Sequence, residues 1–294
     1  MRLLACLAIL LAATPAPGRT AAPAEDLRER ITTMAGEAGA EVGVVVETLD
    51  GARRLAIDET REFHAASTMK VPVMVELYRQ ASARGLALDE EIPVVNAFRS
   101  IVDGSPYSLA VGDDSDAHVY DAVGAKTSYR ALCEAMITTS SNLATNVLIE
   151  RLGVDAIRST VAALGGDGMN VRRGVEDSKA FEAGLNNTTT AKGLAALMLA
   201  IGRGRAVSPR ASEEMAAVLK RQKLNDAIPA GLPAGTVVGH KTGGITRISH
   251  DAAIVYGDTP YVLVVLTRGI DDPKRSATLI ADITRAVHAW VERK

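Results

Sequence analysis

Two residues near the start of a helical stretch have the types and spacing needed for nucleophilic chemistry. Ser67 and Lys70 are three positions apart, so a helix places them on one face, where the amine can reach the hydroxyl. A serine hydroxyl is a poor nucleophile until a nearby base takes its proton. The N-terminus of a helix also offers backbone N–H groups to a developing oxyanion. The pair alone is weak evidence, because about one Ser-x-x-Lys arises by chance in a chain of this length.

A second polar cluster, Ser140-Ser141-Asn142, follows an apolar helical stretch that ends at Ile137. A second hydroxyl can pass a proton to a leaving nitrogen, and an amide can hold a substrate carbonyl. Taken by itself, the cluster equally fits a turn that caps the helix beginning at Asn142.

A third cluster, Lys241-Thr242-Gly243, opens a stretch with the composition of a strand. Lysine and threonine there could bind a carboxylate, and a glycine would let a substrate run close along the strand edge. The alternative is a solvated edge with no ligand. The glycines between 235 and 242 do not have the spacing of a phosphate-binding loop.

Other hydrolytic chemistries fit the sequence less well. The chain lacks the Gly-x-Ser-x-Gly pattern of a nucleophile elbow. Its histidines show no His-x-x-x-His pair or comparable cluster, so the sequence does not predict a zinc site; they are His64, His118, His240, His250 and His288. We therefore expect no cofactor and no metal.

Strands are predicted near both ends of the chain, where they position the first and third clusters. The Val-rich segment 41–49 and the segment 52–58 flank Asp50-Gly51, and 249–256 and 261–267 flank a second turn, which predicts two hairpins. Helical spacing is clear at 25–38 and 274–293. The middle is predicted to be mainly helical, with a polar, loop-rich segment at 99–127; its helices are 69–84, 128–137, 144–151, 190–201 and 211–222.

These elements predict an α/β (α+β) fold. The strands of both chain ends would form one antiparallel sheet with the terminal helices on one face, and a mainly helical lobe would lie beside it. We expect one catalytic domain over 25–294, with a sheet lobe at 25–62 and 236–294 and a helical lobe at 63–235.

Composition and the N-terminus indicate an exported globular protein. Hydrophobic residues make up 47% of the 294 residues and net charge is −2, which favours neither nucleic acid nor an anionic membrane as a partner. Arg2, an apolar run and small residues form a secretory signal peptide, too short to span a bilayer, with cleavage expected after Ala24. Its removal leaves Cys133 as the single cysteine, so no internal disulfide is expected. The mature protein is then secreted or periplasmic.

Taken together, in this order, the three clusters make the sequence resemble the class A serine β-lactamases. The resemblance covers nearly the whole mature chain, including the sheet–helices–sheet order. It implies a fold of the β-lactamase/transpeptidase type. For the chemistry, it implies that Ser67 is acylated, Lys70 exchanges its proton and Ser140 passes a proton to the lactam nitrogen. For substrate binding, it implies that Asn142 binds the substrate side chain and that Lys241 and Thr242 bind the substrate carboxylate. The backbone N–H groups of Ser67 and Gly244 would form the oxyanion hole.

The resemblance also implies a loop glutamate that activates the water for deacylation. Glu176 is the preferred candidate, because it leaves residues for the loop to return before the helix that begins near Thr190. Glu182 is the rival, because Glu182-Ala183-Gly184-Leu185-Asn186 matches the Glu-x-x-Leu-Asn pattern of the family.

Three departures from the family pattern bear on the substrate. Ser141 replaces an aspartate of the second motif, and Ala180 stands where an asparagine would help to hold the water if Glu176 is the base. An arginine expected after the third motif is His250 here, with Arg247 or Arg275 as alternative cations.

We expect the chain to be a monomer that hydrolyses small-molecule β-lactams without a cofactor. A D,D-peptidase shares the three motifs and needs no glutamate of this type, and a sensor would form an acyl-enzyme and keep it. Turnover of a penicillin separates these alternatives.

Overall fold

A five-stranded antiparallel sheet forms the centre of the protein. The computed structural model describes residues 21–293. The strand order is β2-β1-β11-β10-β9, with bounds Glu41–Thr48 (β1), Arg54–Ile57 (β2), Val237–Ile245 (β9), Ile248–Tyr256 (β10) and Tyr261–Arg268 (β11). The first and last hairpins pair through β1 and β11, where Val44 lies opposite Val265. The predicted sheet of strands from both chain ends is confirmed, and β9 is one of its edges.

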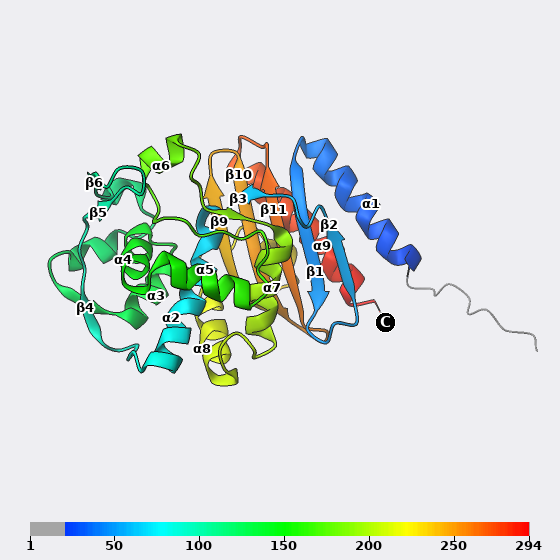
Figure 1. Cartoon of the computed structure of the whole chain (residues 1–294). Helices are drawn as coiled ribbons and strands as arrows, with labels where there is room; N and C mark the ends of the chain where they lie inside the picture. The colour runs from blue at the N-terminus through cyan, green and yellow to red at the C-terminus, as the bar shows by residue number, and fades with distance from the viewer. Residues whose placement is uncertain (1–20, 294) are drawn as a thin grey trace, which may run out of the picture.

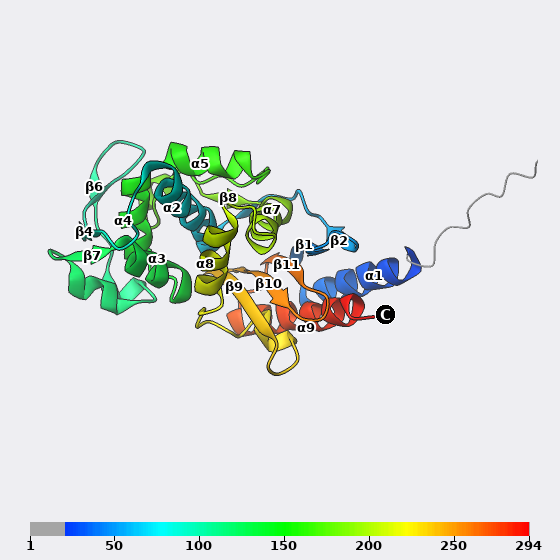
Figure 2. The same ribbon diagram turned by 90° about the horizontal axis from the view of Figure 1, so that it is seen from below.

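Both faces of this sheet are covered, and its side chains alternate between two cores. Val44 and Val46 face the core shared with α1 (Ala21–Ala38) and α9 (Pro273–Val291), whereas Val45 faces the core of the helical lobe. Figure 2 shows α1 and α9 side by side under the sheet, with the other helices on the opposite side. Burial on both faces explains why these strands are continuous apolar runs.

The helical lobe packs on the other face and beside the edge strand β9 (Figure 1). α7 (Ala191–Gly202) lies across β1, β10 and β11, and α8 (Pro209–Leu219) lies against β9. The remaining helices are α2 (Lys70–Arg84), α3 (Tyr129–Thr138), α4 (Asn142–Leu152), α5 (Val154–Ala163) and α6 (Ser178–Glu182). The five helices predicted in this region are all present within a few residues of their expected bounds. The sequence did not predict α5 and α6: α5 has no side-chain cap at its start, and α6 is only five residues long.

The segment predicted as loop-rich has only short elements. Between 98 and 128 the chain forms β5 (Phe98–Arg99), β6 (Pro106–Tyr107), two 3₁₀ turns (Val111–Asp113 and Ala117–Ala122) and β7 (Lys126–Ser128). β7 pairs with β4 (Glu91–Pro93), and a separate pair joins β3 (Phe63–His64) to β8 (Thr188–Thr189). The 3₁₀ turns bring the polar residues that follow Gly112 to the edge of the site.

The N-terminal helix starts earlier than predicted. α1 begins at Ala21, so the expected cleavage site after Ala24 falls in its first turn. Most of the predicted signal peptide, residues 1–20, lies outside the described residues. Within residues 21–293, no helix has the length and apolar character needed to span a bilayer.

Candidate active site

Ser67 lies in a 3₁₀ turn, Ala66–Met69, immediately before α2. Ala66 has φ +44°, a left-handed conformation that non-glycine residues rarely adopt, and its N–H donates to His64 Nδ1 at 3.0 Å. Thr68 Oγ1 closes the turn by donating to Ala65 O at 2.6 Å. This local geometry, rather than a regular first helical turn, presents the Ser67 side chain to the cavity.

The Lys70 amine is buried at the first residue of α2 and faces the second motif. Its Nζ donates to Ser140 O at 2.7 Å and to Asn142 Oδ1 at 2.8 Å, and lies 3.2 Å from Ser140 Oγ. Burial, followed by the nearby positive charge of Lys241, holds the pKa of Lys70 well below its usual value. Among the described residues, no hydrogen bond joins this amine to Ser67. The hydrogen bonds of the Lys70 amine thus go to Ser140 and Asn142.

Ser140 lies between the two lysines. Lys241 Nζ donates to Ser140 Oγ at 2.9 Å and to Thr242 O at 2.8 Å. Burial lowers the pKa of Lys241 to about 7, although the charge of Asp251 acts in the opposite direction. The first and third motifs therefore meet at one hydroxyl of the second motif.

Asn142 connects this group to Glu176. Its Nδ2 donates to Glu176 Oε1 at 2.6 Å while its Oδ1 accepts from Lys70. Burial raises the pKa of Glu176, the hydrogen bond from Asn142 opposes that shift, and the charges of Asp114 and Asp113 add to it. The Asn142 amide therefore bridges an amine and a carboxyl group next to Ser67.

The loop that carries Glu176 is fastened to α4 one turn beyond Asn142. Asn146 Oδ1 accepts from Val175 N at 2.7 Å, and its Nδ2 donates to Val175 O at 3.0 Å. A side chain at Gly174 would meet Asn146 Oδ1 at 2.7 Å, so this contact requires glycine. Asn142 and Asn146, spaced for one helix face, thus fix the position of Glu176 from both sides.

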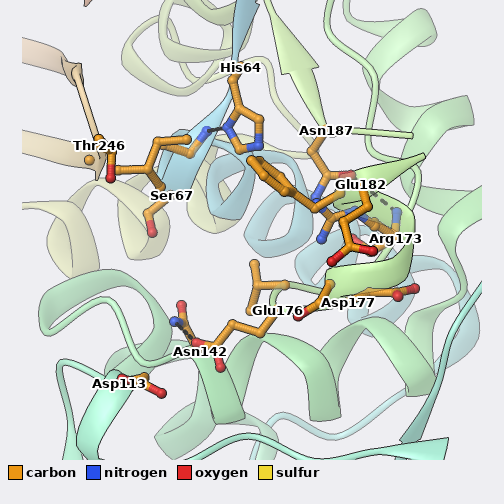
Figure 3. A pocket seen from close by; sticks show the side chains of 16 residues that line it. His64, Ser67, Asp113, Asn142, Arg173, Glu176, Asp177, Glu182, Asn187 and Thr246 are labelled. Carbon is orange, nitrogen blue, oxygen red and sulfur yellow. Dashed lines mark hydrogen bonds between the residues drawn. The ribbon is translucent and has the colours of Figure 1, made fainter. Parts of the chain in front are cut away.

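Glu182, the rival candidate, lies at the end of α6 and is exposed. It lines the same cavity as Glu176 (Figure 3), but its carboxyl group has no hydrogen bond to Asn142 among the described residues. Ala180, at the position discussed for a water-holding asparagine, is fully buried. Of the two glutamates, the structure brings Glu176 to the lysine–serine–asparagine group.

Strained backbone is concentrated at the site. Among the described residues, five non-glycine residues have positive φ, and three of them are Ala66, Ser140 and Glu176. Each such residue costs on the order of 1–3 kcal/mol, which the surrounding contacts must offset. Two of the strained residues, Ser140 and Glu176, also make the side-chain contacts to Lys70, Lys241 and Asn142.

The edge strand β9 comes unusually close to the turn that carries Ser67. A side chain at Gly243 would meet Thr68 N at 3.0 Å and Ser67 N at 3.1 Å. At Gly244 there is more room, because the atom nearest to an added methyl group would be Ile248 O at 3.7 Å. Gly243 is therefore required by packing, and Gly244 lies where it lines the cavity together with Ser67.

Neither arginine considered for carboxylate binding lies in the cleft. Arg247 donates to Gly269 O at 3.0 Å and pairs with Asp271, and Arg275 is exposed outside both cavities that contain Ser67. His250 is buried, its Nε2 lies 2.9 Å from His64 O, and burial lowers its pKa to about 4. Of the cations considered for the substrate carboxylate, Lys241 of the third motif is thus the one that lies at the cleft.

Two connected cavities meet at Ser67. The larger, of about 610 Å³, extends toward Glu176, and the second, of about 430 Å³, extends along Thr242 and Ser140. Figure 3 shows Ser67 on one side of the larger cavity, with Asn142 and Glu176 on the opposite side. The arrangement offers a nucleophile, two amines, a proton-relay hydroxyl and a carboxyl base around one space.

Three acidic residues at the site were not singled out by sequence reasoning. Asp114 accepts hydrogen bonds from the first turn of α4, while Asp113 and Asp226 are exposed and line the cavities. The two aspartates at 113 and 114 belong to the polar run noted in the loop-rich segment, but no spacing rule connects that run to the second motif.

Comparison with known proteins gives a consistent picture. Residues 26–291 match the model of a family described as the β-lactamase enzyme family. A β-lactamase of Streptomyces albus G is 26% identical, covering 95% of this chain and 92% of that protein. The β-lactamase CTX-M-8 of Citrobacter amalonaticus is 25% identical, covering 96% and 92%.

Solved structures with the same architecture include both β-lactamases and a protein named PBP-A. A β-lactamase from Sphaerobacter thermophilus is 26% identical with a TM-score of 0.74, over 90% of this chain and 97% of that one. PBP-A is 27% identical with a TM-score of 0.75, over 90% and 95%.

Proposed function

Because the chain belongs to the β-lactamase enzyme family, as a class A serine hydrolase of β-lactams, we propose that it opens the lactam through an acyl-enzyme on Ser67, which a water activated by Glu176 then hydrolyses. The observation that carries this proposal is the Asn142 amide, which joins the buried Lys70 amine to the Glu176 carboxyl group beside the nucleophile.

Acylation requires a proton to leave Ser67 and another to reach the lactam nitrogen. Lys70 is the proposed acceptor, since burial and the charge of Lys241 lower its pKa and so favour the neutral amine that can accept a proton. Ser140 is the proposed donor to the nitrogen, because its hydroxyl contacts both Lys70 and Lys241, and it regains a proton from the Lys70 ammonium. The C–N bond of the lactam breaks as the Ser67 ester forms, and the backbone N–H groups of Ser67 and Gly244 would hold the oxyanion.

Deacylation requires a base for a water molecule. Glu176 supports this role because it lines the cavity with Ser67 and its raised pKa makes it a stronger base than an exposed glutamate. The hydroxide equivalent attacks the ester carbonyl and the proton goes to Glu176. A proton then returns from Glu176 through Lys70 to the Ser67 oxygen as that oxygen leaves.

The substrate carboxylate is assigned to Lys241 and Thr242. The cavity along β9 is lined by Ser140, Thr242 and Gly243, and Lys241 supplies a buried charge behind them. Asn142 and the Glu176 side of the larger cavity are left for the acyl side chain of the substrate.

The test compares Glu176→Gln with Glu182→Gln, because the glutamine keeps the shape of each side chain and removes the base. With a penicillin, Glu176→Gln is expected to accumulate a long-lived acyl-enzyme, seen as an added mass on the intact protein, and to lose steady-state hydrolysis by about 10²–10⁴-fold. Glu182→Gln, the control at the same cavity, is expected to turn over like the wild type. Ser67→Ala should show no adduct.

Two results would redirect the proposal. Trapping by Glu182→Gln but not by Glu176→Gln would make Glu182 the base. A wild-type acyl-enzyme that persists for hours would instead favour a peptidase or a sensor.

We also propose that the protein is exported as a monomer after removal of a leader ending at Ala24. The support is the arrangement of Arg2, the apolar run and the small residues near the N-terminus. N-terminal sequencing of the secreted protein and its mass in solution test these two points.

A further inference from the structure

The second motif is held from outside by a short loop segment, 114–116, that sequence reasoning did not connect to it. Asp114 accepts two hydrogen bonds from Asn142 N, at 3.0 Å to Oδ1 and 2.9 Å to Oδ2. Leu143 N donates to Asp114 Oδ2 at 2.9 Å, and Ser141 Oγ donates to it at 3.3 Å. A single carboxylate therefore binds the backbone N–H groups that open α4.

The next residue of the segment holds the other side of the motif. Ser115 Oγ donates to Ser140 O at 3.0 Å, and the same carbonyl accepts from Lys70 Nζ. Ser140 has φ +64°, so its backbone stays in this conformation only while neighbouring contacts fix it. Segment 114–116 supplies those contacts from a part of the chain that lies 25 or more positions away.

These contacts to Asp114 and Ser115 bear on the site because Asn142, the first residue of α4, connects two of its ionisable groups. The Asn142 side chain gives its oxygen to Lys70 and its nitrogen to Glu176. A rotation of the helix start displaces both ends of that amide together. The backbone of Asn142 is fixed on the opposite side by Asp114.

We propose that Asp114 is a positioning residue for both chemical steps, which sets the Asn142 amide between Lys70 and Glu176 by binding the start of α4. Ser141 occupies the place where the second motif of related enzymes has an aspartate, and here a carboxylate reaches the same backbone from another segment. This inference rests on the proposed function, because it assigns Asn142, Lys70 and Glu176 to the reaction.

The charge of Asp114 also acts on the two ionisable groups that Asn142 joins. It raises the pKa of Lys70 against the larger effect of burial, and it adds to the raised pKa of Glu176. Replacing Asp114 by asparagine is therefore expected to lower the pKa of both groups. The acidic limb of the pH profile of turnover, which Glu176 sets, then moves to lower pH. A loss of folding alone does not produce this change.

The experiment compares Asp114→Asn with Asp121→Asn. Asp121 is exposed in the same loop-rich segment, and its one ion-pair partner among the described residues is His118 at 3.9 Å. We expect Asp114→Asn to lower the rate of Ser67 acylation by a penicillin, and its turnover, by about 100-fold, because the reacting groups are displaced. Asp121→Asn should stay within twofold of the wild type. Circular dichroism at the assay temperature establishes the folded fraction of each.

A second variant tests whether the position of the carboxylate is what matters. Ser141→Asp alone puts a second carboxylate beside the first, because Ser141 Oγ lies 3.3 Å from Asp114 Oδ2, and this variant is expected to be impaired. In Asp114→Asn/Ser141→Asp, the carboxylate moves across the same contact to the cap of α4. We expect this double variant to recover at least tenfold of the activity lost in Asp114→Asn, and so to exceed both single variants.

Two results would overturn the inference. One is an Asp114→Asn enzyme as active as Asp121→Asn, or one whose lost activity equals its unfolded fraction with an unmoved pH profile. The other is a double variant no better than the single ones. Acylation is measured by intact mass before turnover, so a wild type that acylates but does not deacylate refutes the proposed hydrolysis and still tests Asp114.

Discussion

Substitution of two adjacent glycines in β9, Gly243 and Gly244, by alanine is expected to have different effects on activity, and the comparison tests how closely the strand must approach the nucleophile. In Gly243→Ala, the added methyl group would lie 3.0 Å from Thr68 N and 3.1 Å from Ser67 N. Ordinary carbon contacts are about 3.5–4.0 Å, so β9 and the Ser67 turn must separate by roughly 0.5 Å. Both obstacles are backbone atoms, which cannot rotate away as a side-chain end could.

The expected cost of Gly243→Ala falls on catalysis as well as on stability. Overpacking of this kind costs about 1–3 kcal/mol of unfolding free energy. Loss of one oxyanion-hole donor costs about 10²–10³ in kcat, so a partial displacement of the Ser67 N–H is expected to lower kcat/KM by roughly 10–100-fold. Gly244→Ala keeps its N–H and has 3.7 Å to the nearest atom, so its loss should be several-fold smaller.

The assay is steady-state hydrolysis of a penicillin, with urea unfolding measured in parallel. Equal kcat/KM in the two alanine variants would refute the close approach of β9 to Ser67. A Gly243→Ala enzyme that loses stability but keeps full kcat would show that the Ser67 N–H is not needed for the transition state.

Two further predictions concern charge. Glu176 must be deprotonated to act and its pKa is raised, so kcat should fall on the acidic side at a higher pH than an exposed glutamate would give. Lys241 loses its charge above about pH 7, so KM should rise on the alkaline side. Lys241→Arg should remove that rise, whereas Lys241→Ala should raise KM at every pH. The exposed carboxylates that line the cavities are Asp113, Glu182 and Asp226, so a penicillin with an α-ammonium group should have a higher kcat/KM than its α-carboxylate analogue. Asp113→Asn should reduce the ratio of these two kcat/KM values roughly fivefold, as expected for about 1 kcal/mol between close charges in water.

The parts of the fold and site that sequence predicted are those governed by local pattern. A Val-rich run before Asp50-Gly51 and the segment after it gave the first hairpin, and the three motifs named Lys70, Ser140 and Lys241, which lie together in the structure. Each of these signals is contained in a few consecutive residues whose spacing matches one element.

What sequence did not predict depends on contacts between distant, irregular segments. Asp114 reaches the start of α4 from a loop without periodicity, and its neighbours in sequence give no sign of that partner. The preference for Glu176 over Glu182 rested on loop length, whereas in the structure it is Asn142 and Asn146 that place the loop. The hydrogen bonds of the Lys70 amine to Ser140 and Asn142 also join distant segments, whereas helical spacing relates Lys70 only to Ser67.

The two buried amines determine the direction in which Ser140 can move a proton. Both have lowered pKa values, but the charge of Lys241 is among the causes that lower the pKa of Lys70, while Asp251 supports the charged form of Lys241. Asp114 and Glu176 support the charged form of Lys70 in the same way, so the two amines oppose each other's charge and are not readily protonated together. Lys241 donates to Ser140 Oγ, and the hydroxyl proton of Ser140 is free to point toward Lys70 or toward a leaving nitrogen. When a neutral Lys70 accepts the Ser67 proton and passes a proton to Ser140 as Ser140 delivers its own to the lactam nitrogen, the second buried positive charge is only transient.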